Sequence, residues 1–152
     1  MENENIENVE KKYKKKINIV EVIIAISIIL LLTLVFYPKF LDVIRKSNEA
    51  TTRANLAALR TAIAVYYGDN EGSFPSANIV KELLSEDGKY IKYIPKAYCP
   101  PYTNPTNEIT TAPTGNSGRW AYQVRDSQDR QAGEIWVDCD KKDSKGVVWN
   151  TY

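Results

Sequence analysis

Residues 14–40 read KKKINIVEVIIAISIILLLTLVFYPKF, and the rest of the chain is organised around this stretch. After three lysines comes an apolar run that holds no charged residue between Val22 and Tyr37. A helix that crosses the hydrocarbon core of a membrane needs about 20 mostly apolar residues. We therefore expect residues 17–38 to form the membrane-spanning half of a long helix, with a kink at Pro38, where proline removes a helical hydrogen bond.

The flanks of the apolar run predict its orientation. Five of the six residues from 11 to 16 are lysines. By the positive-inside rule, residues 1–16 form a basic leader in the cytoplasm, and residues 39–152 form an extracytoplasmic domain. A cleaved secretory signal peptide is the alternative, but its apolar core is typically about 7–15 residues long and is followed by small residues at the cleavage site. The apolar run of residues 17–37 is longer than such a core, and the sequence FYPKFLD at its end has no alanine or glycine for the cleavage site.

Glu21 is a carboxylate near the start of the apolar run. A carboxylate at the centre of a membrane helix costs about 2.5–3.5 kcal/mol on insertion scales, and less towards the edge. Two interpretations stay open. Glu21 is either a boundary residue that reaches the lipid headgroups, or a group that pairs with a cation supplied by another chain.

Two motifs of the first half resemble a known family. INIVE at residues 17–21 precedes the apolar run, and Pro38 follows Glu21 by seventeen residues. Residues 53–75 then read RANLAALRTAIAVYYGDNEGSFP. Together these motifs resemble the N-terminal half of type IV pilins and of type II secretion pseudopilins. The second half of the chain is most similar in style to the small G-type major pseudopilins.

The resemblance implies a pilin-like α+β fold, in which a long N-terminal helix packs against a small antiparallel sheet. It implies a structural subunit of the inner (cytoplasmic) membrane that polymerises through its apolar helix into a type IV pilus or a secretion pseudopilus. An assembly platform in the inner membrane would be its partner, and the filament would lie in the periplasm or at the cell surface. Glu21 is then the assembly residue.

The resemblance also implies a processing junction between Lys16 and Ile17. Members of the family carry a leader that ends in glycine, and prepilin peptidase cuts after it. The new N-terminal amine is methylated and pairs with the glutamate of a neighbouring subunit. Lys16 stands where the family has glycine, so cleavage by that peptidase stays open.

The pattern after Pro38 predicts the outer half of the long helix. An apolar stripe recurs at helical spacing, formed by Leu56, Leu59, Ile63 and Tyr66. Gly68 is expected to cap this helix. A short helix should follow over residues 77–84, capped by Ser76.

The last third of the chain predicts a small sheet. Residues 120–124 and 134–139 are rich in strand-forming side chains and should form an antiparallel hairpin. Residues 147–152 could add a third, terminal strand. Between the helices and the hairpin, residues 99–118 hold several prolines and should form an irregular loop. The hairpin needs a cover for its apolar face, which the outer half of the long helix offers.

Cys99 and Cys139 both lie in the domain that is expected outside the cytoplasm, where disulfides persist. A bond between them would close a loop of about 40 residues, worth up to about 4 kcal/mol in the chain-entropy model. Two separate thiols are the alternative.

Three aspartates near the C-terminus, Asp138, Asp140 and Asp143, are weak candidates for calcium. The resemblance implies a calcium site in this region, since G-type pseudopilins have one there. Their spacing does not match the EF-hand loop, and a solvated acidic turn is the alternative.

Composition argues against catalysis and nucleic-acid binding. The chain has no histidine and a net charge of +1, so it lacks a common general base and any strong basic field. No nucleophile triad or phosphate-binding loop is present, which predicts that the protein is not an enzyme. A filament subunit is therefore the main hypothesis. Its alternative is a membrane-anchored binding module that does not assemble.

Overall fold

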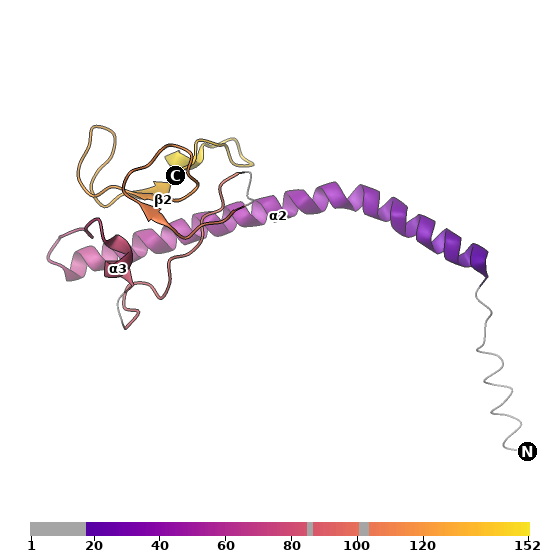
Figure 1. The fold of residues 1–152 in the computed structure, drawn as a ribbon, viewed down its shortest axis with the longest axis horizontal. Coiled ribbons are helices and arrows are strands. Elements are labelled where there is room, and N and C mark those ends of the chain that lie inside the picture. The colour runs from indigo at the N-terminus through magenta and orange to yellow at the C-terminus, as the bar shows by residue number, and fades with distance from the viewer. Residues whose placement is uncertain (1–17, 85–86, 101–103) are drawn as a thin grey trace, which may run out of the picture. The chain divides into compact units, whose positions relative to one another are not determined.

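The computed structural model describes residues 18–84, 87–100 and 104–152, so Lys16, Ile17 and the basic leader lie outside the described residues. The chain divides into two compact units between Asp42 and Val43. Helix α2 (Ile19–Asp69) begins in the first unit and ends in the second (Figure 1). This division lies four residues beyond the boundary between residues 38 and 39 that the sequence predicts for the membrane-spanning half and the outer domain.

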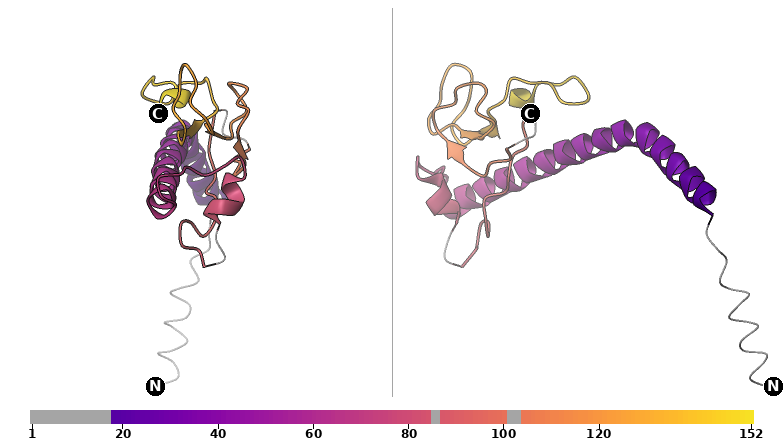
Figure 2. Two further views of the ribbon diagram at one scale, coloured as in Figure 1. Left: turned by 90° about the vertical axis from the view of Figure 1, so that its left-hand side faces the viewer. Right: turned by 45° about the vertical axis from the view of Figure 1, so that its right-hand side comes forward.

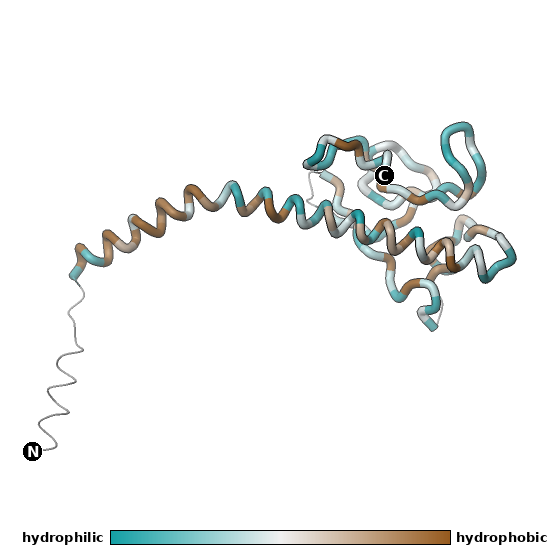
Figure 3. The backbone as a smooth tube through the Cα atoms, turned by 180° about the vertical axis from the view of Figure 1, so that it is seen from behind, coloured by the Kyte–Doolittle hydropathy of each residue, from teal (hydrophilic) through white to brown (hydrophobic). Residues whose placement is uncertain are grey.

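The first unit consists of the apolar part of α2, which is long and apolar enough to cross a membrane. Figure 3 shows the apolar residues concentrated along this part of the helix. Ser27 and Thr33 donate their hydroxyl protons to the carbonyls one turn earlier, so neither leaves an unsatisfied donor on this apolar surface. The helix continues through Pro38, so the proline does not end it, and the kink stays a prediction.

The second unit holds the rest of α2 and the other elements: α3 (Ile79–Leu83), β1 (Ile109–Thr110), β2 (Trp120–Tyr122), β3 (Ile135–Val137) and the 3-10 helix η1 (Trp149–Thr151). The strands form one sheet in the order β1-β2-β3. Both views of Figure 2 place the sheet and the C-terminal segment along one side of the magenta part of α2. This α+β layout confirms the expected fold class and is consistent with a pilin-like fold.

The core lies between the predicted stripe of α2 and the sheet. Leu56, Leu59 and Ile63 are buried, and Tyr66 packs against them at the edge. From the sheet side the buried cluster includes Trp120, Tyr122, Ile135, Val137 and Trp149. Two buried polar groups find partners: the Trp120 indole donates to the Pro95 carbonyl and the Tyr122 hydroxyl to that of Pro75. The stripe and the hairpin were therefore predicted correctly.

The sheet is mixed, which corrects the expected antiparallel sheet. β2 and β3 pair antiparallel, but β1 pairs parallel with β2, with Ile109 opposite Trp120. β1 arises inside residues 99–118, which were expected to be irregular. The reason is that the edge of β2 has main-chain groups to satisfy, and the Trp120 amide donates to the Glu108 carbonyl at 3.0 Å.

Residues 147–152 do not form the expected third strand of that sheet. Val148 makes an isolated bridge with Lys142, and η1 follows. The amides of Trp149 and Asn150 donate to the carbonyls of Lys141 and Cys139, so the segment turns back over the end of β3. These contacts bury Trp149 fully, which an exposed edge strand would not do.

The ends of both helices also differ from expectation. α3 is shorter than residues 77–84, with Asn78 at its N-cap position. The backbone amide of Ser76 donates instead to the Glu82 carboxylate. Gly68 does not cap α2, since the helix reaches Asp69. Beyond it, Glu71 and Gly72 both have positive φ, and the Gly72 amide donates to the Tyr67 carbonyl, as at a helix end closed by a left-handed residue.

Glu71 is the left-handed residue at this helix end, with φ 54°. A non-glycine residue pays about 1 kcal/mol for this conformation. Glu71→Gly should therefore raise the free energy of unfolding of the detergent-solubilised chain by about 1 kcal/mol, measured by denaturant unfolding. Glu71→Ala is the control, because it removes the charge but keeps the strain. An equal gain in both variants would contradict the backbone explanation.

Candidate functional site

The apolar part of α2 is the first functional surface. Its large side chains are exposed on all faces, with 78% exposure for Ile19 and 75% for Leu34. Surface of this kind and length is not left in water by a stable protein. Such a surface is suited to contact with lipid or with other apolar helices.

Glu21 lies in the first turn of α2 and is exposed. The positive end of the helix dipole favours a carboxylate in that turn. Among residues 18–38, Glu21 is the one ionisable group apart from Tyr37. Glu21 is therefore a single point of charge on an otherwise apolar surface.

A second set of charged residues fixes the outer domain to α2. Glu49 is fully buried and accepts a hydrogen bond from the Ser144 amide at 2.9 Å and another from the Ser144 hydroxyl. One turn later, Arg53 pairs with the Asp143 carboxylate at 2.8 Å. Two adjacent residues of the C-terminal loop are thus held by two turns of the helix.

Asp143 is surrounded by donors. Tyr152 donates its hydroxyl proton to the carboxylate, and the amides of Val147 and Lys145 donate as well. Burial by itself raises the pKa of Asp143, but these hydrogen bonds and the charge of Arg53 outweigh it and hold the pKa below its usual value. The carboxylate is therefore ionised at neutral pH and organises the C-terminal turn.

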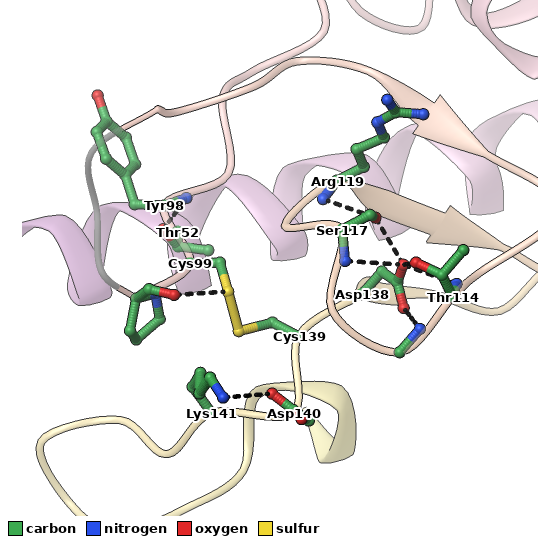
Figure 4. The surroundings of a disulfide bond; sticks show 12 residues. Thr52, Tyr98, Cys99, Thr114, Ser117, Arg119, Asp138, Cys139, Asp140 and Lys141 are labelled. Carbon is green, nitrogen blue, oxygen red and sulfur yellow. Dashed lines mark hydrogen bonds and ion pairs between the residues drawn. A yellow bond between two sulfur atoms is a disulfide. The ribbon is translucent and has the colours of Figure 1, made fainter.

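Asp138 organises a second loop in the same way (Figure 4). Its oxygens accept hydrogen bonds from the amides of Thr114, Gly115 and Ser117 and from the Ser117 hydroxyl. Burial again raises the pKa of Asp138. The hydrogen bonds from the Ser117 hydroxyl and the three amides lower the pKa by more than burial raises it, so the net shift is downward. A side chain with 1% exposure thus ties β3 to residues 114–117.

The predicted Cys99–Cys139 disulfide is present, with its Cα atoms 6.2 Å apart (Figure 4). Cys139 follows Asp138 directly and is fully buried. On the other side, the Tyr98 amide donates to the buried hydroxyl of Thr52 on α2. The disulfide therefore links the end of β3 to a segment that is itself fixed to the helix.

The calcium candidates do not come together. Asp138 and Asp143 are engaged by N–H and O–H donors in separate loops, while Asp140 is exposed and lies 3.4 Å from the Lys141 ammonium. Calcium takes about 6–8 oxygen ligands, and within the described ranges no group of three potential ligands is close enough to hold a metal ion. These residues therefore do not fit a calcium site.

Sequence reasoning missed the residues that fix the domain, above all Glu49 and Arg53. A signal was present for Glu49: it precedes Thr52, Leu56 and Leu59 at spacings of 3, 7 and 10, on the buried face of α2. A carboxylate that continues an apolar stripe predicts a buried partner. That the partner is Ser144 follows from tertiary structure alone.

Comparison with known proteins gives no family. No family model, curated protein or solved structure matches this chain at a significant level.

Asp138 and Asp143 make stability depend on pH. Their pKa values are lower in the folded chain than in the unfolded chain, where the pKa of an aspartate is about 3.9. Their stabilisation is therefore complete above that pH and is lost as pH falls through the folded pKa values. We expect Asp138→Asn to lower the free energy of unfolding at pH 7 by about 2 kcal/mol and to flatten the fall in acid.

Asp140→Asn is the matched control two positions along the same segment. Because Asp140 is exposed, the variant should keep wild-type stability at neutral pH and the wild-type dependence on acid. Thermal unfolding followed by near-ultraviolet circular dichroism, in steps from neutral pH into acid, measures both. Identical acid profiles for Asp138→Asn and Asp140→Asn would contradict the assigned role of Asp138.

Proposed function

We propose that this chain is a structural subunit that polymerises through the apolar part of α2 into a filament of the type IV pilus or type II secretion pseudopilus kind. The observation that carries the proposal is the apolar part of α2, which is exposed on all faces and bears Glu21 in its first turn. In the membrane, lipid covers this surface. In a filament, the same helices of other subunits replace the lipid.

Glu21 distinguishes assembly from anchoring alone. A helix that merely anchors a binding module needs no carboxylate in its apolar run, where a charge makes insertion less favourable. An assembling helix gains a fixed register, because a buried charge has to meet its counter-charge at one stagger and not at others. The cation would be the N-terminal amine of a neighbouring subunit if the leader is removed, or Lys15 or Lys16 of a neighbour if it is retained.

The same proposal includes the topology. The leader lies in the cytoplasm, the apolar helix crosses the inner membrane once, and the domain from residue 39 onward lies outside. The disulfide supports an external place for that domain, since disulfides persist in oxidising compartments. Such a domain would reach the filament surface already folded.

Glu21→Val tests the role of the carboxylate. Membrane insertion should stay intact or improve, because a charge is removed from the apolar run. Assembly should fall by about tenfold or more, as expected for losing about 1.4 kcal/mol per contact. Thr33→Val is the control, since it changes polarity in the same segment without touching a charge. Filaments sheared from cells and quantified by immunoblot give the measurement, and a normal yield from Glu21→Val would contradict the proposal.

Lys16→Gly tests the processing junction. Glycine restores the residue that the family has before the cut, so the cleaved fraction should rise, with Ile17 as the first residue by N-terminal sequencing. The assembled fraction should rise with it, because moving the leader lysines into a bilayer costs about 2.5–3.5 kcal/mol each. Lys12→Gly is the control and should change neither fraction. Wild-type filaments whose subunits retain the leader would separate cleavage from assembly and refute the link.

A further inference from the structure

Three exposed lysines, Lys141, Lys142 and Lys145, lie in a loop with a fixed conformation. The Asp143 carboxylate in the middle of the loop accepts hydrogen bonds from the amides of Lys145 and Val147, at 2.8 and 2.9 Å. The loop is therefore shaped by a buried group, and its lysines are presented outward.

The loop lies over the first turns of α2 in the second unit. Ser144 is bound to Glu49 and Asp143 to Arg53, as described above, and Lys142 lines one small pocket together with Arg45. These are the turns that follow the apolar part of the helix in the sequence. The loop lysines thus lie at the end of the domain where α2 enters it, near residues 45–53.

The helix adds two more cations at this place. Arg45 and Lys46 are exposed and directly follow Val43 and Ile44, two exposed apolar side chains of the same unit. Apolar residues followed by long cationic side chains are typical of a segment at the membrane–water interface.

The acidic residues around these cations offset only part of their positive charge. Glu49 and Asp143 are buried and engaged by Ser144 and Arg53. Asp140 is exposed and pairs with Lys141, and Asp42 is exposed three residues before Arg45 on α2. These two exposed carboxylates stand against five exposed cations. The exposed charge at this end of the domain is therefore mainly positive.

We propose that this cationic collar, formed by Arg45, Lys46, Lys141, Lys142 and Lys145, binds anionic phospholipid headgroups while the subunit is in the membrane. Basic side chains next to a membrane helix are attracted to anionic lipid, and the attraction falls off within a Debye length of about 8 Å. The contact holds the folded domain at the membrane surface. The inference rests on membrane insertion of the apolar helix and not on filament assembly.

Lysine acetylation of the full chain in lipid nanodiscs tests the collar. Nanodiscs of phosphatidylcholine alone are compared with nanodiscs of equal parts phosphatidylcholine and phosphatidylglycerol, and modification is read by mass spectrometry. In the anionic discs Lys142 and Lys145 should react about threefold more slowly. Lys81 on α3 is the internal control and should react equally in both. In about 1 M salt, where the Debye length is about 3 Å, the protection should disappear.

A double variant makes the test specific. Lys46→Gln/Lys141→Gln removes two charges of the collar but keeps both reporter lysines, and it should reduce their protection. Lys92→Gln/Lys96→Gln removes the same charge elsewhere in the domain and should leave the protection unchanged. Equal reactivity in both kinds of disc overturns the proposal. Equal protection in detergent micelles without lipid also overturns it, and would indicate a contact with a second copy of the chain. Filament yield is not measured, so failure here is distinct from failure of the assembly proposal.

Discussion

The packing of one stripe of α2 against a very small sheet is the interaction on which the outer domain depends. Strands of two or three residues cannot form a stable sheet by themselves. They become a core because Leu56, Leu59 and Ile63 cover one side, and because the disulfide and the buried aspartates fix the connecting loops. The helix thus holds both the segment that is apolar enough to cross a membrane and the largest piece of the domain core.

Buried carboxylates hold the connecting loops of this domain in place, because its strands are too short to do so. Asp138 holds residues 114–117, Asp143 holds the C-terminal turn, and Glu49 holds that turn on the helix. Each is satisfied by several donors, which is the condition under which a buried charge is tolerated. The same hydrogen bonds occupy acceptor positions of Asp138 and Asp143 that a metal ion would need.

Periodicity and residue type were sufficient for the helix, its buried stripe, the β2–β3 hairpin and the disulfide, because these depend on local pattern or on compartment. The parallel pairing of β1 could not be predicted, because it depends on which segment meets the free edge of β2. The turn at η1 depends on hydrogen bonds to the carbonyls of Cys139 and Lys141, which lie outside the local sequence of the turn. Glu71 and not Gly68 has the left-handed conformation, and the helix ends where Tyr66 packs on Tyr90 and Tyr67 on Phe74, contacts that local sequence does not reveal.

We propose that the apolar part of α2 exchanges lipid for other copies of itself. Electron cryomicroscopy of filaments sheared from cells that produce the chain is the direct test of this exchange. We expect a helical filament built from this chain, with the segment around Glu21 in its core and a cation of a neighbouring subunit at the carboxylate. Filaments that lack the chain, with the protein found as a dispersed monomer in the membrane fraction, would contradict it.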